Sequence, residues 1–559
     1  MPLPITLYND YLQKEFTLLP EHTIEENKLK IYCCGPTIYN YQQIGNMRAA
    51  FVPTVLRDLA ELAGWSPELA INITDVGHLT GDNLGDADSG EDRMEQAAKK
   101  EGKTAEEIAD FYLRDYHKQL DALNIFIPTG VFNPKATEYL VEQAVLALTL
   151  LSKQQAYLLE DGIYFDSNQN TEALAVLNTF VGLPKSSGNN DFTDREIVNT
   201  TKNPGDFALW KFVDENNLQK WRIKDFVSIK STVETDEVTT LLSICREHLD
   251  EESFFRLQDS WGCPGWHTEC VAMIARIMGR KNIRRRANFN FDDFQGKTTL
   301  DLHLGGIEHL PLHHKNEILQ AEALGFTLSE NWLHWQHVLV DGKKMGKSLG
   351  NSYLVTGNAE VTGFESVVEK GYDPLAYRLM LFEHHYSQPL DFTWDKLAQA
   401  QTRLFNMRKE KAKIYSFYQA FQFGNFNKDK FESSKAQIIA PGLNNLDLAG
   451  LLNNYQELLL TTSNQIKDEN FLDNSSYFAL SEIDEDLLKL GLWSCSSEKG
   501  LGGKEPSEKV LDLAKQRKEA KEIKDYAKTD EIRNQILKLG WQIDDYSWGY
   551  GLWWRGGVK

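Results

Sequence analysis

Residues 31–48, IYCCGPTIYNYQQIGNMR, decide how the surrounding chain folds. A short apolar run ends in two cysteines, and a Gly-Pro-Thr turn follows at residues 35–37. From Ile44 onward, apolar residues recur at helical spacing through Met47, Phe51, Val55 and Leu59. A strand, a glycine turn and a helix in this order are typical of a parallel α/β sheet with a nucleotide site at the carboxyl end of its first strand. The orphan N–H groups at the N-terminus of such a helix suit phosphate.

The length and composition of the chain limit which class of protein it can belong to. At 559 residues the chain is long enough for about three or four domains, and 42% hydrophobic residues can fill several cores. No uninterrupted apolar segment approaches the roughly 20 residues that cross a bilayer, and the N-terminus lacks the basic and apolar blocks of a signal peptide. Six cysteines favour free thiols or a metal site in a reducing compartment over a disulfide framework. We therefore expect a cytoplasmic protein that makes no membrane contact.

The net charge of −21 argues against indiscriminate binding to nucleic acid, because phosphate contacts need lysine and arginine. It does not exclude a local basic surface on an acidic protein. Motifs must therefore decide whether RNA is a partner.

Two further stretches carry metal-ligating side chains. The segment GCPGWHTEC at 262–270 contains two thiols and an imidazole, and LHHKNE at 312–317 opens an apolar helical pattern. On a helix Glu317 shares a face with His313, but His314 would also fit, so the spacing leaves both histidines open. Cys34, at the end of the first strand, adds another sulfur. Sulfur combined with imidazole nitrogen favours zinc.

Taken in order, the motifs resemble those of the cysteinyl-tRNA synthetases, a family of class I aminoacyl-tRNA synthetases. Residues 43–46, QIGN, stand where the family has its HIGH motif, and KMGKS at 344–348 stands where it has KMSKS. The lysines of such a loop can neutralise charge as pyrophosphate departs. The likeness extends through DFALWK at 206–211 and DLHLGGIE at 301–308 to WWR at 553–555.

The resemblance implies one zinc ion per chain and a pocket for the substrate cysteine. The implied zinc ligands are Cys34, Cys270, His313 and Glu317. The implied contacts to the substrate cysteine are Thr74, Trp266 and His267. A soft metal that binds the thiolate would select cysteine over serine, whereas an apolar pocket discriminates by only about 1–3 kcal/mol.

The resemblance also implies the residues that act on ATP and its Mg²⁺. The catalytic residues would be Gln43, Asn46, Lys344, Lys347 and Ser348. The ATP-binding residues would be Gly35, Thr37, Gly45, His303, Gly305, Gly306, Glu308 and, again, Lys347. Gln43 departs from the family's histidine, because its amide donates a hydrogen bond but cannot become cationic. Our hypothesis is that Gln43 replaces the histidine geometrically, with Gln42 or Lys347 compensating.

The implied activity is that of a cysteine–tRNA ligase, which activates L-cysteine with ATP and transfers it to the 3′ end of tRNA(Cys). We expect a monomer. Two alternatives stay open: a ligase that joins cysteine to an amino sugar in thiol-cofactor synthesis, and a tRNA-binding paralogue with a weakened active site. The C-terminal tail argues against the first, because those ligases are shorter. The intact zinc quartet argues against the second.

The implied fold is of the α/β class: a class I Rossmann-type nucleotide-binding catalytic domain with an inserted connective domain, followed by a helical bundle and a small C-terminal domain. A second buried strand is predicted at 71–75, and helical spacing of apolar residues predicts helices after residue 395. The expected ranges are 1–130 for the first half of the Rossmann domain, 131–258 for the connective insertion, 259–340 for the second half with the zinc site, 341–394 for the KMSKS-type loop and stem-contact region, 395–490 for the helical tRNA-binding bundle, 491–508 for a linker, and 509–559 for the anticodon-recognition domain.

Overall fold

The computed structural model of the chain describes residues 1–25, 27–77, 93–170, 201–203, 205–227, 237–279, 289–346, 349–421, 426–493 and 505–556. Lys347, Ser348 and most of the predicted linker lie outside the described residues. The chain divides into two compact units. The first unit comprises Met1–Gln42, Gly64–Asp115 and Ile127–Trp335, and the second comprises Gln43–Ala63, Tyr116–Phe126 and Gln336–Lys559.

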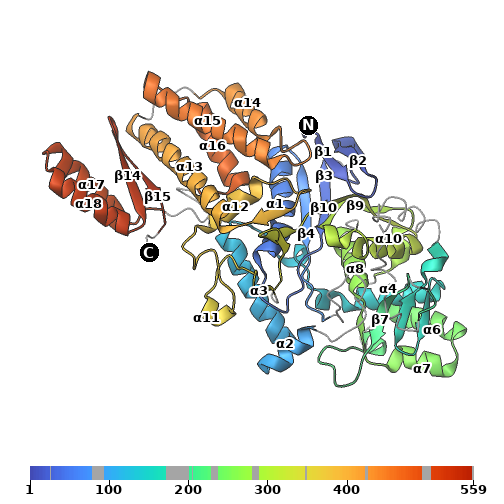
Figure 1. The fold of residues 1–559 in the computed structure, drawn as a ribbon. Coiled ribbons are helices and arrows are strands. Elements are labelled where there is room, and N and C mark those ends of the chain that lie inside the picture. Colours follow the sequence, from blue (N-terminus) through green and yellow to red (C-terminus); the bar gives the residue numbers. More distant parts are fainter. Residues whose placement is uncertain are drawn as a thin grey trace. The chain divides into compact units, whose positions relative to one another are not determined.

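A four-stranded parallel sheet organises the first unit (Figure 1). Its strands lie in the order β10 (Thr327–Trp335), β9 (Thr298–Gly306), β3 (Lys28–Cys33) and β4 (Ser66–Ile71), and all neighbouring pairs are parallel. Leu29, Ile31 and Tyr32 of β3 are fully buried, as is expected of a parallel strand whose two faces are covered. The predicted α/β class and the predicted first strand are thereby confirmed.

The second strand ends earlier than the sequence predicts. We expected a strand at 71–75, whereas β4 ends at Ile71 and the next residues form only isolated bridges. At this point a side-chain hydrogen bond replaces the backbone hydrogen bonds of the sheet. The Oδ1 atom of Asn72 accepts from the N–H of Gly35 at 2.8 Å. Residues 71–75 are all buried, which explains why their pattern resembles a strand.

The first unit also contains an antiparallel sheet and a hairpin. The antiparallel sheet has the order β5 (Ala156–Leu159), β6 (Gly162–Phe165), β7 (Phe207–Phe212) and β8 (Gly262–Pro264). The hairpin pairs β1 (Ile5–Asn9) with β2 (Lys14–Leu18). The helices of this unit are α2 (Arg93–Glu101), α4 (Leu140–Ser152), α6 (Glu237–His248), α7 (Glu251–Asp259), α8 (Trp266–Met278) and α10 (His313–Ala323), while α3 (Ala105–Ala122) continues into the second unit.

Helices α8 and α10 bring their first turns to the carboxyl edge of the parallel sheet. The two helices pack against each other, α8 also contacts β9, and α10 contacts β10 (Figure 1). Apolar residues from the middle of each helix, such as Ile274 and Leu319, are fully buried in this packing. Because α10 begins a few residues after the carboxyl end of β9, its first turn lies where a parallel sheet places its functional side chains.

The second unit begins with α1 (Ile44–Leu62), which starts where the sequence predicts. Its residues Met47, Phe51, Val55 and Leu59 are buried, so the helical spacing indicated the correct face. A small sheet in this unit has the order β12 (Lys343–Lys344), β11 (Val338–Val340) and β13 (Leu390–Phe392).

A helical bundle follows in the second unit. It contains α12 (Pro374–Phe382), α13 (Trp394–Phe421), α14 (Lys428–Ile439), α15 (Leu448–Glu469) and α16 (Asn474–Ile483), and α13 packs against α12 and α15 (Figure 1). A one-turn helix, α11 (Ala359–Thr362), precedes it. The predicted apolar face of α13 is buried at Leu397, Ala400, Leu404 and Met407.

The C-terminal module of the second unit has its own apolar core. It consists of α17 (Glu508–Glu522), α18 (Tyr526–Lys538) and the hairpin β14 (Trp541–Tyr546) and β15 (Gly549–Trp554). Its core is formed by Val510, Leu513, Ala514, Ile532, Ile536, Trp541 and Ile543. Among the described residues of the whole chain, no helix combines the length and the apolar character that crossing a bilayer requires.

Candidate metal centre and motif residues

Four predicted metal ligands meet in the first unit. Cys34 directly follows β3, Cys270 lies in the second turn of α8, and His313 and Glu317 lie one turn apart at the start of α10. Their ligand atoms all lie within 4.8 Å of one another, and all four side chains are buried.

The geometry of this group fits zinc. The Sγ atoms of Cys34 and Cys270 are 3.7 Å apart, close to the separation of about 3.8 Å that two Zn–S bonds of about 2.3 Å give in a tetrahedron. Nε2 of His313 lies 3.0 Å from Oε1 of Glu317. The second carboxylate oxygen of Glu317, Oε2, is buried and lies 3.0 Å from Nε2 of His303, so each oxygen of this carboxylate faces one histidine.

The pocket favours the anionic form of two of its four candidate ligands, Glu317 and Cys270. Burial alone would raise the pKa of Glu317, but His313 and His303 hold that pKa well below its ordinary value. Burial also opposes charging of His313, yet Glu317 and Cys270 raise its pKa to about 10. The hydrogen bond from Cys34 lowers the pKa of Cys270, whereas burial raises the pKa of Cys34. Anionic carboxylate and thiolate are the forms that bind a metal cation, so Glu317 and Cys270 suit one, whereas Cys34 and His313 bind it only after losing a proton.

The turn after β3 holds Gly35 and Thr37 next to Thr74. A Cβ on Gly35 would lie 1.7 Å from the carbonyl oxygen of Asn72, so only glycine fits there. The amide of Asn72 accepts from the N–H of Gly35 and donates to Oγ1 of Thr74 at 3.3 Å, and Thr74 forms a parallel bridge with Thr37. Sγ of Cys270 lies 4.0 Å from Oδ1 of Asn72. Sequence reasoning missed Asn72, because it stands inside a predicted strand.

The first turn of α8 places both predicted pocket aromatics beside His313. The rings of Trp266 and His313 have centroids 4.3 Å apart and are inclined by 31°. Nδ1 of His267 lies 3.0 Å from Nδ1 of His313. The structure therefore brings Trp266 and His267 to one metal-ligand candidate.

Four further predicted ATP-binding residues, His303, Gly305, Gly306 and Glu308, lie at or just after the carboxyl end of β9. His303 is fully buried, stacks on Trp332 at 4.7 Å, and has its Nε2 3.0 Å from Oε2 of Glu317. Gly305 is needed where it stands, because a Cβ would lie 2.5 Å from the ring of His314. Gly306 ends the strand, and Glu308 is exposed in the turn that follows. His303 thus faces the metal-ligand candidates.

The QIGN motif lies in the second unit, at the N-terminus of α1. Gln43 is the N-cap residue, and its N–H donates to Oδ1 of Asn46 at 2.9 Å. The N–H of Asn46 donates in turn to the carbonyl of Gln43 at 2.8 Å. A Cβ on Gly45 would lie 3.1 Å from Cε of Met345, so glycine lets the helix start close to the KMGKS segment.

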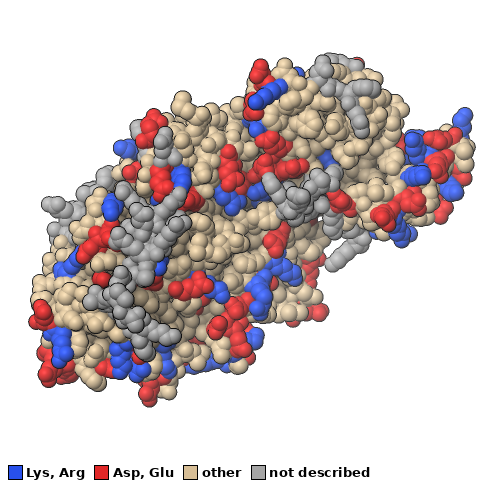
Figure 2. Space-filling view, turned by 180° about the vertical axis from the view of Figure 1, so that it is seen from behind, with Lys and Arg blue, Asp and Glu red and all other residues tan. Residues whose placement is uncertain are grey.

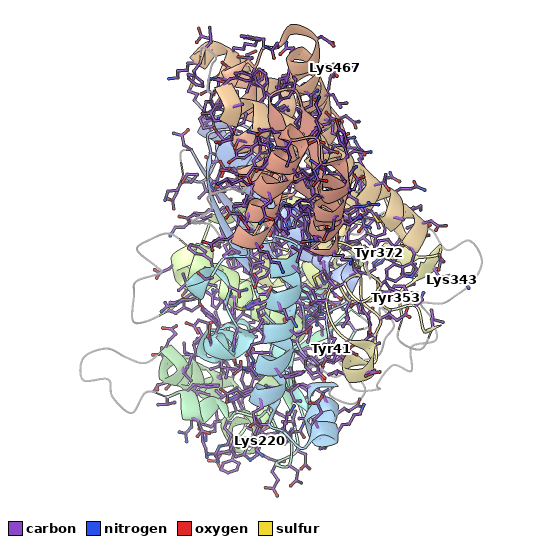
Figure 3. All side chains as sticks on the ribbon, turned by 90° about the vertical axis from the view of Figure 1, so that its left-hand side faces the viewer. Tyr41, Lys220, Lys343, Tyr353, Tyr372 and Lys467 are labelled. Atoms are coloured by element: carbon purple, nitrogen blue, oxygen red, sulfur yellow. The ribbon has the colours of Figure 1, made fainter. Side chains whose placement is uncertain are left out.

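The KMGKS segment begins on β12. Lys344 is exposed, and Asn351 closes the loop that follows: its Oδ1 accepts from the N–H of Gly346 at 2.9 Å, and its Nδ2 donates to the carbonyl of Lys344 at 3.2 Å. Figure 3 labels Lys343, the neighbour of Lys344, and Tyr353, which follows the loop in the same yellow part of the ribbon. The role of Asn351 was not predicted, although it stands only three residues after the quoted motif.

Known proteins resemble this chain over most of its length. A family model described as the catalytic domain of class I (C) tRNA synthetases matches residues 20–224 and 233–402. A cysteine–tRNA ligase of Bacteroides fragilis is 28% identical over 565 residues, which covers 98% of each chain. A cysteine–tRNA ligase of Novosphingobium aromaticivorans is 29% identical and covers 97% of this chain and 95% of its own.

Among solved structures, a methionyl-tRNA synthetase of Mycobacterium tuberculosis bound by methionyl-adenylate aligns over 83% of this chain and 88% of its own, with a TM-score of 0.48 and 10% identity. The match to the family model spans more than half of the sequence and includes every candidate metal ligand. The chain therefore belongs to the class I (C) tRNA synthetases.

Proposed function

We propose that this protein is a cysteine–tRNA ligase. It activates L-cysteine with ATP to cysteinyl-adenylate and transfers the cysteinyl group to the 3′ end of tRNA(Cys). The observation that carries the proposal is the convergence of Cys34, Cys270, His313 and Glu317 in one buried pocket of a chain from this family. The two cysteine–tRNA ligases compared above align from end to end, which also supports this activity.

The metal pocket selects the amino acid. Zinc bound there would supply a soft Lewis acid that holds the substrate thiolate and lowers its pKa. Trp266 and His267 pack against His313 and wall the pocket on the α8 side. Thr74 is held by Asn72, so its position is fixed relative to Cys270. Serine is rejected because its hydroxyl is a poor ligand for a sulfur-rich zinc site.

The remaining motif residues serve ATP, which binds with Mg²⁺. In the second unit, Gln43 donates from its amide, and Lys344 and Lys347 neutralise charge that develops on the phosphates. Gly45 and Asn46 shape the start of α1, whose N–H groups suit a phosphate. In the first unit, Gly305 and Gly306 end β9 and let the side chains of His314 and Glu308 pack closely against the strand.

The C-terminal half supports tRNA as the acceptor. The relatives cover the helical bundle and the C-terminal module as well as the catalytic part, since the alignments span 97–98% of this chain. An amino-sugar acceptor is disfavoured, because ligases of that kind are shorter. A cytoplasmic location is supported by the described cysteines, none of which forms a disulfide bond.

The test is ATP-dependent charging of a tRNA pool with radiolabelled cysteine, with serine as competitor. We expect cysteine-specific charging that a zinc chelator abolishes and added zinc restores. A zinc-loaded, folded protein that charges no tRNA would contradict the proposal. Cysteine-dependent pyrophosphate exchange would then separate an amino-sugar ligase, which retains it, from an inactive paralogue, which lacks it.

A matched pair of cysteine variants tests the metal ligands. Cys270→Ser replaces one zinc ligand, so we expect loss of bound zinc and a fall in kcat/KM for cysteine of about 100-fold or more. Cys263→Ser is the control, because Cys263 lies on β8 and belongs to neither ligand group found among the described residues. Equal zinc content in the two variants would show that Cys270 is not a zinc ligand.

A further inference from the structure

The segment 213–227 directly follows β7 in the first unit and has no part in the proposed function so far. It turns at Asp214, whose carbonyl accepts from the N–H of Asn217 at 3.0 Å. The chain then returns, and Trp221 forms an antiparallel bridge with Gly262 of β8. The N–H groups of these two residues each donate to the carbonyl of the other, at 2.8 and 2.9 Å. The segment therefore lies alongside β8 and extends the antiparallel sheet at its edge.

The segment is held firmly around this bridge. Ile223 is fully buried in the core of the first unit. Lys220, which Figure 3 labels, and Arg222 place their cationic groups 5.3 and 4.4 Å from the ring centroid of Trp261. Such cation–π contacts, together with the buried isoleucine, fix the backbone on both sides of the bridge. The side chain of the preceding residue, Gln219, is thereby presented in one position.

Gln219 holds a second stretch of the chain with its side-chain amide. Its Oε1 accepts from the N–H of Gly77 at 2.7 Å, and its Nε2 donates to the carbonyl of Asp75 at 2.8 Å. One side chain thus pairs a backbone donor and a backbone acceptor two residues apart, as a neighbouring strand would do. Glutamine can do this because its amide has both an acceptor oxygen and a donor nitrogen. Residues 75–77 are therefore tied to the segment 213–227.

The two stretches that the segment joins carry the two predicted sides of the cysteine pocket. Thr74 directly precedes the residues that Gln219 holds. Trp266 and His267 begin α8, which follows β8 after the single residue Gly265. One end of the connection thus reaches Thr74, and the other reaches the aromatic side chains at the start of α8.

Gln219 restrains Thr74 in a direction that its other backbone bonds do not. The N–H of Thr74 donates to the carbonyl of Pro36 at 3.1 Å, and its carbonyl accepts from the N–H of Ile38 at 3.0 Å. These bonds fix Thr74 relative to the turn after β3, whereas Gln219 fixes the adjoining residues relative to β8. If one side of a pocket is loosened, only a fraction of the molecules is competent to bind, and the apparent affinity falls by that fraction. The affinity for cysteine should therefore depend on Gln219.

We propose that the segment 213–227 sets the spacing between the two sides of the cysteine pocket and that Gln219 is its positioning residue. Gln219 acts through the backbone of residues 75–77 on Thr74 and does not itself touch the substrate. The inference rests on the proposed function for the identity of the substrate. The two hydrogen bonds of Gln219 described above involve none of the four candidate zinc ligands, so zinc binding should not depend on it.

The first test is the kinetics of Gln219→Met, a variant that keeps the length of the side chain and removes both hydrogen bonds. We expect the KM for cysteine in pyrophosphate exchange to rise about tenfold, with kcat within about twofold and the zinc content unchanged. Asn216→Ala is the matched control, because Asn216 is exposed in the same segment and its amide bonds to Asp214. It should leave the KM unaltered. An unchanged KM in Gln219→Met, or a lower kcat at the same KM, would overturn the proposal.

Hydrogen exchange supplies a second test that does not depend on activity. In Gln219→Met the amides of Ile73 and Thr74 should exchange faster than in the starting protein, because the stretch that follows them is released. Amides of α10 should not change. Faster exchange that is confined to Gly77, whose own hydrogen bond is lost, would overturn the proposal.

Gln219→Glu decides the matter if the methionine variant does not fold. Its carboxylate still accepts from Gly77 but turns an oxygen toward the carbonyl of Asp75, so the KM for cysteine and the exchange at Thr74 should again rise. A starting protein without cysteine-dependent pyrophosphate exchange would refute the ligase, and the exchange at Thr74 would then decide this inference alone. An active ligase whose KM for cysteine is the same in the Gln219 variants would refute this inference and leave the ligase standing.

Discussion

In the proposed ATP site, Gln43 stands at the N-cap of α1, where the family has a histidine. Its backbone is fixed by the paired hydrogen bonds with Asn46. The neighbouring Gln42 is less able to compensate, because its amide already donates to the carbonyls of Thr37 and Asn40 at 3.1 Å each. In the proposed ATP site, we therefore assign the donor for phosphate to the side-chain amide of Gln43.

Gln43→Ala should lower the rate of cysteine-dependent pyrophosphate exchange by about 100–1000-fold, because one donor to the transition state is lost. Gln43→His should stay within about tenfold of the starting protein if the glutamine replaces the histidine geometrically. Zinc content serves as the control and should not change in either variant. A histidine variant that is many times faster would contradict the geometric replacement.

Asp484 makes the stability of the second unit depend on pH. It is buried in a π-helical turn (Asp484–Leu488), and its carboxylate accepts from the N–H groups of Leu490, Leu492 and Trp493. Burial nevertheless raises its pKa to about 6. A carboxyl whose pKa is higher in the folded state binds its proton more tightly there. Its stabilising effect is thus fully present below about pH 4 and is lost as the pH rises through about 6.

Urea denaturation of the wild type and Asp484→Asn at several pH values isolates this effect. The amide cannot titrate, so the stability advantage of the wild type over the variant should shrink by about 3 kcal/mol between pH 4 and pH 7. The variant itself is expected to be less stable, because its NH₂ group faces backbone donors. An advantage that is constant or grows with pH would mean that Asp484 is ionised in the folded protein throughout this range.

Single residues also show where sequence reasoning stops. The spacing in LHHKNE left His313 and His314 open, and the structure explains why: His313 faces Glu317 and His267, while His314 faces Cys34 and His334. Both are buried beside the same centre. The side chains of neighbouring helical residues point in directions about 100° apart. His313 and His314 therefore meet different partners, which other strands and helices supply. Spacing within one helix cannot reveal those partners.

At the scale of elements, local patterns were sufficient where a hydrophobic face decides the structure. The helices α1 and α13 and the strand β3 have the predicted buried faces. The prediction of a strand at 71–75 was wrong. The side chain of Asn72 makes a hydrogen bond to the N–H of Gly35, and the pattern of apolar residues gives no indication of this bond. The same residue ties Thr74 to the turn after β3. Contacts of this kind come from the tertiary fold and have no local signal.

Ion pairs to Asp545 connect α17 to β14 in the C-terminal module. Arg517 of α17 donates to both oxygens of Asp545 of β14, at 2.6 and 2.8 Å, and Lys521 lies 3.2 Å away. Hydrogen bonds from Arg517 lower the pKa of Asp545 to about 2. Its contribution is therefore present above about pH 4 and is lost as the pH falls toward 2.

Asp545→Asn should loosen this module at pH 7. Because Asp545 is partly exposed, solvent screens the pair, and we expect a loss of about 1 kcal/mol or less. Amide hydrogen exchange of peptides from β14 and β15 should then be faster by up to about fivefold, with no change in peptides from α12. Asp530→Asn, at an exposed position of α18, is the control and should leave the exchange unaltered. Unchanged hydrogen exchange in β14 would show that this ion pair does not stabilise the C-terminal module.

At the scale of the whole molecule, the net negative charge of the protein lowers its affinity for RNA. The chain has 81 acidic and 60 basic residues. On the face shown in Figure 2, acidic and basic side chains are interspersed over the described surface, without one extended basic area. An acidic protein repels polyanions at long range, so phosphate contacts must come from lysines and arginines that a matching RNA can reach together.

The salt dependence of charging should therefore differ between the two substrates. Between 50 and 200 mM salt we expect the KM for tRNA to rise at least about tenfold, because each phosphate contact releases counterions. The KM for cysteine, measured by pyrophosphate exchange without tRNA, should change little, because the metal pocket is buried and salt screens buried charges weakly. A non-cognate tRNA should not compete measurably at 200 mM salt, since the net charge of −21 leaves little non-specific affinity. Equal competition by cognate and non-cognate tRNA at that salt concentration would show that binding is governed by charge alone.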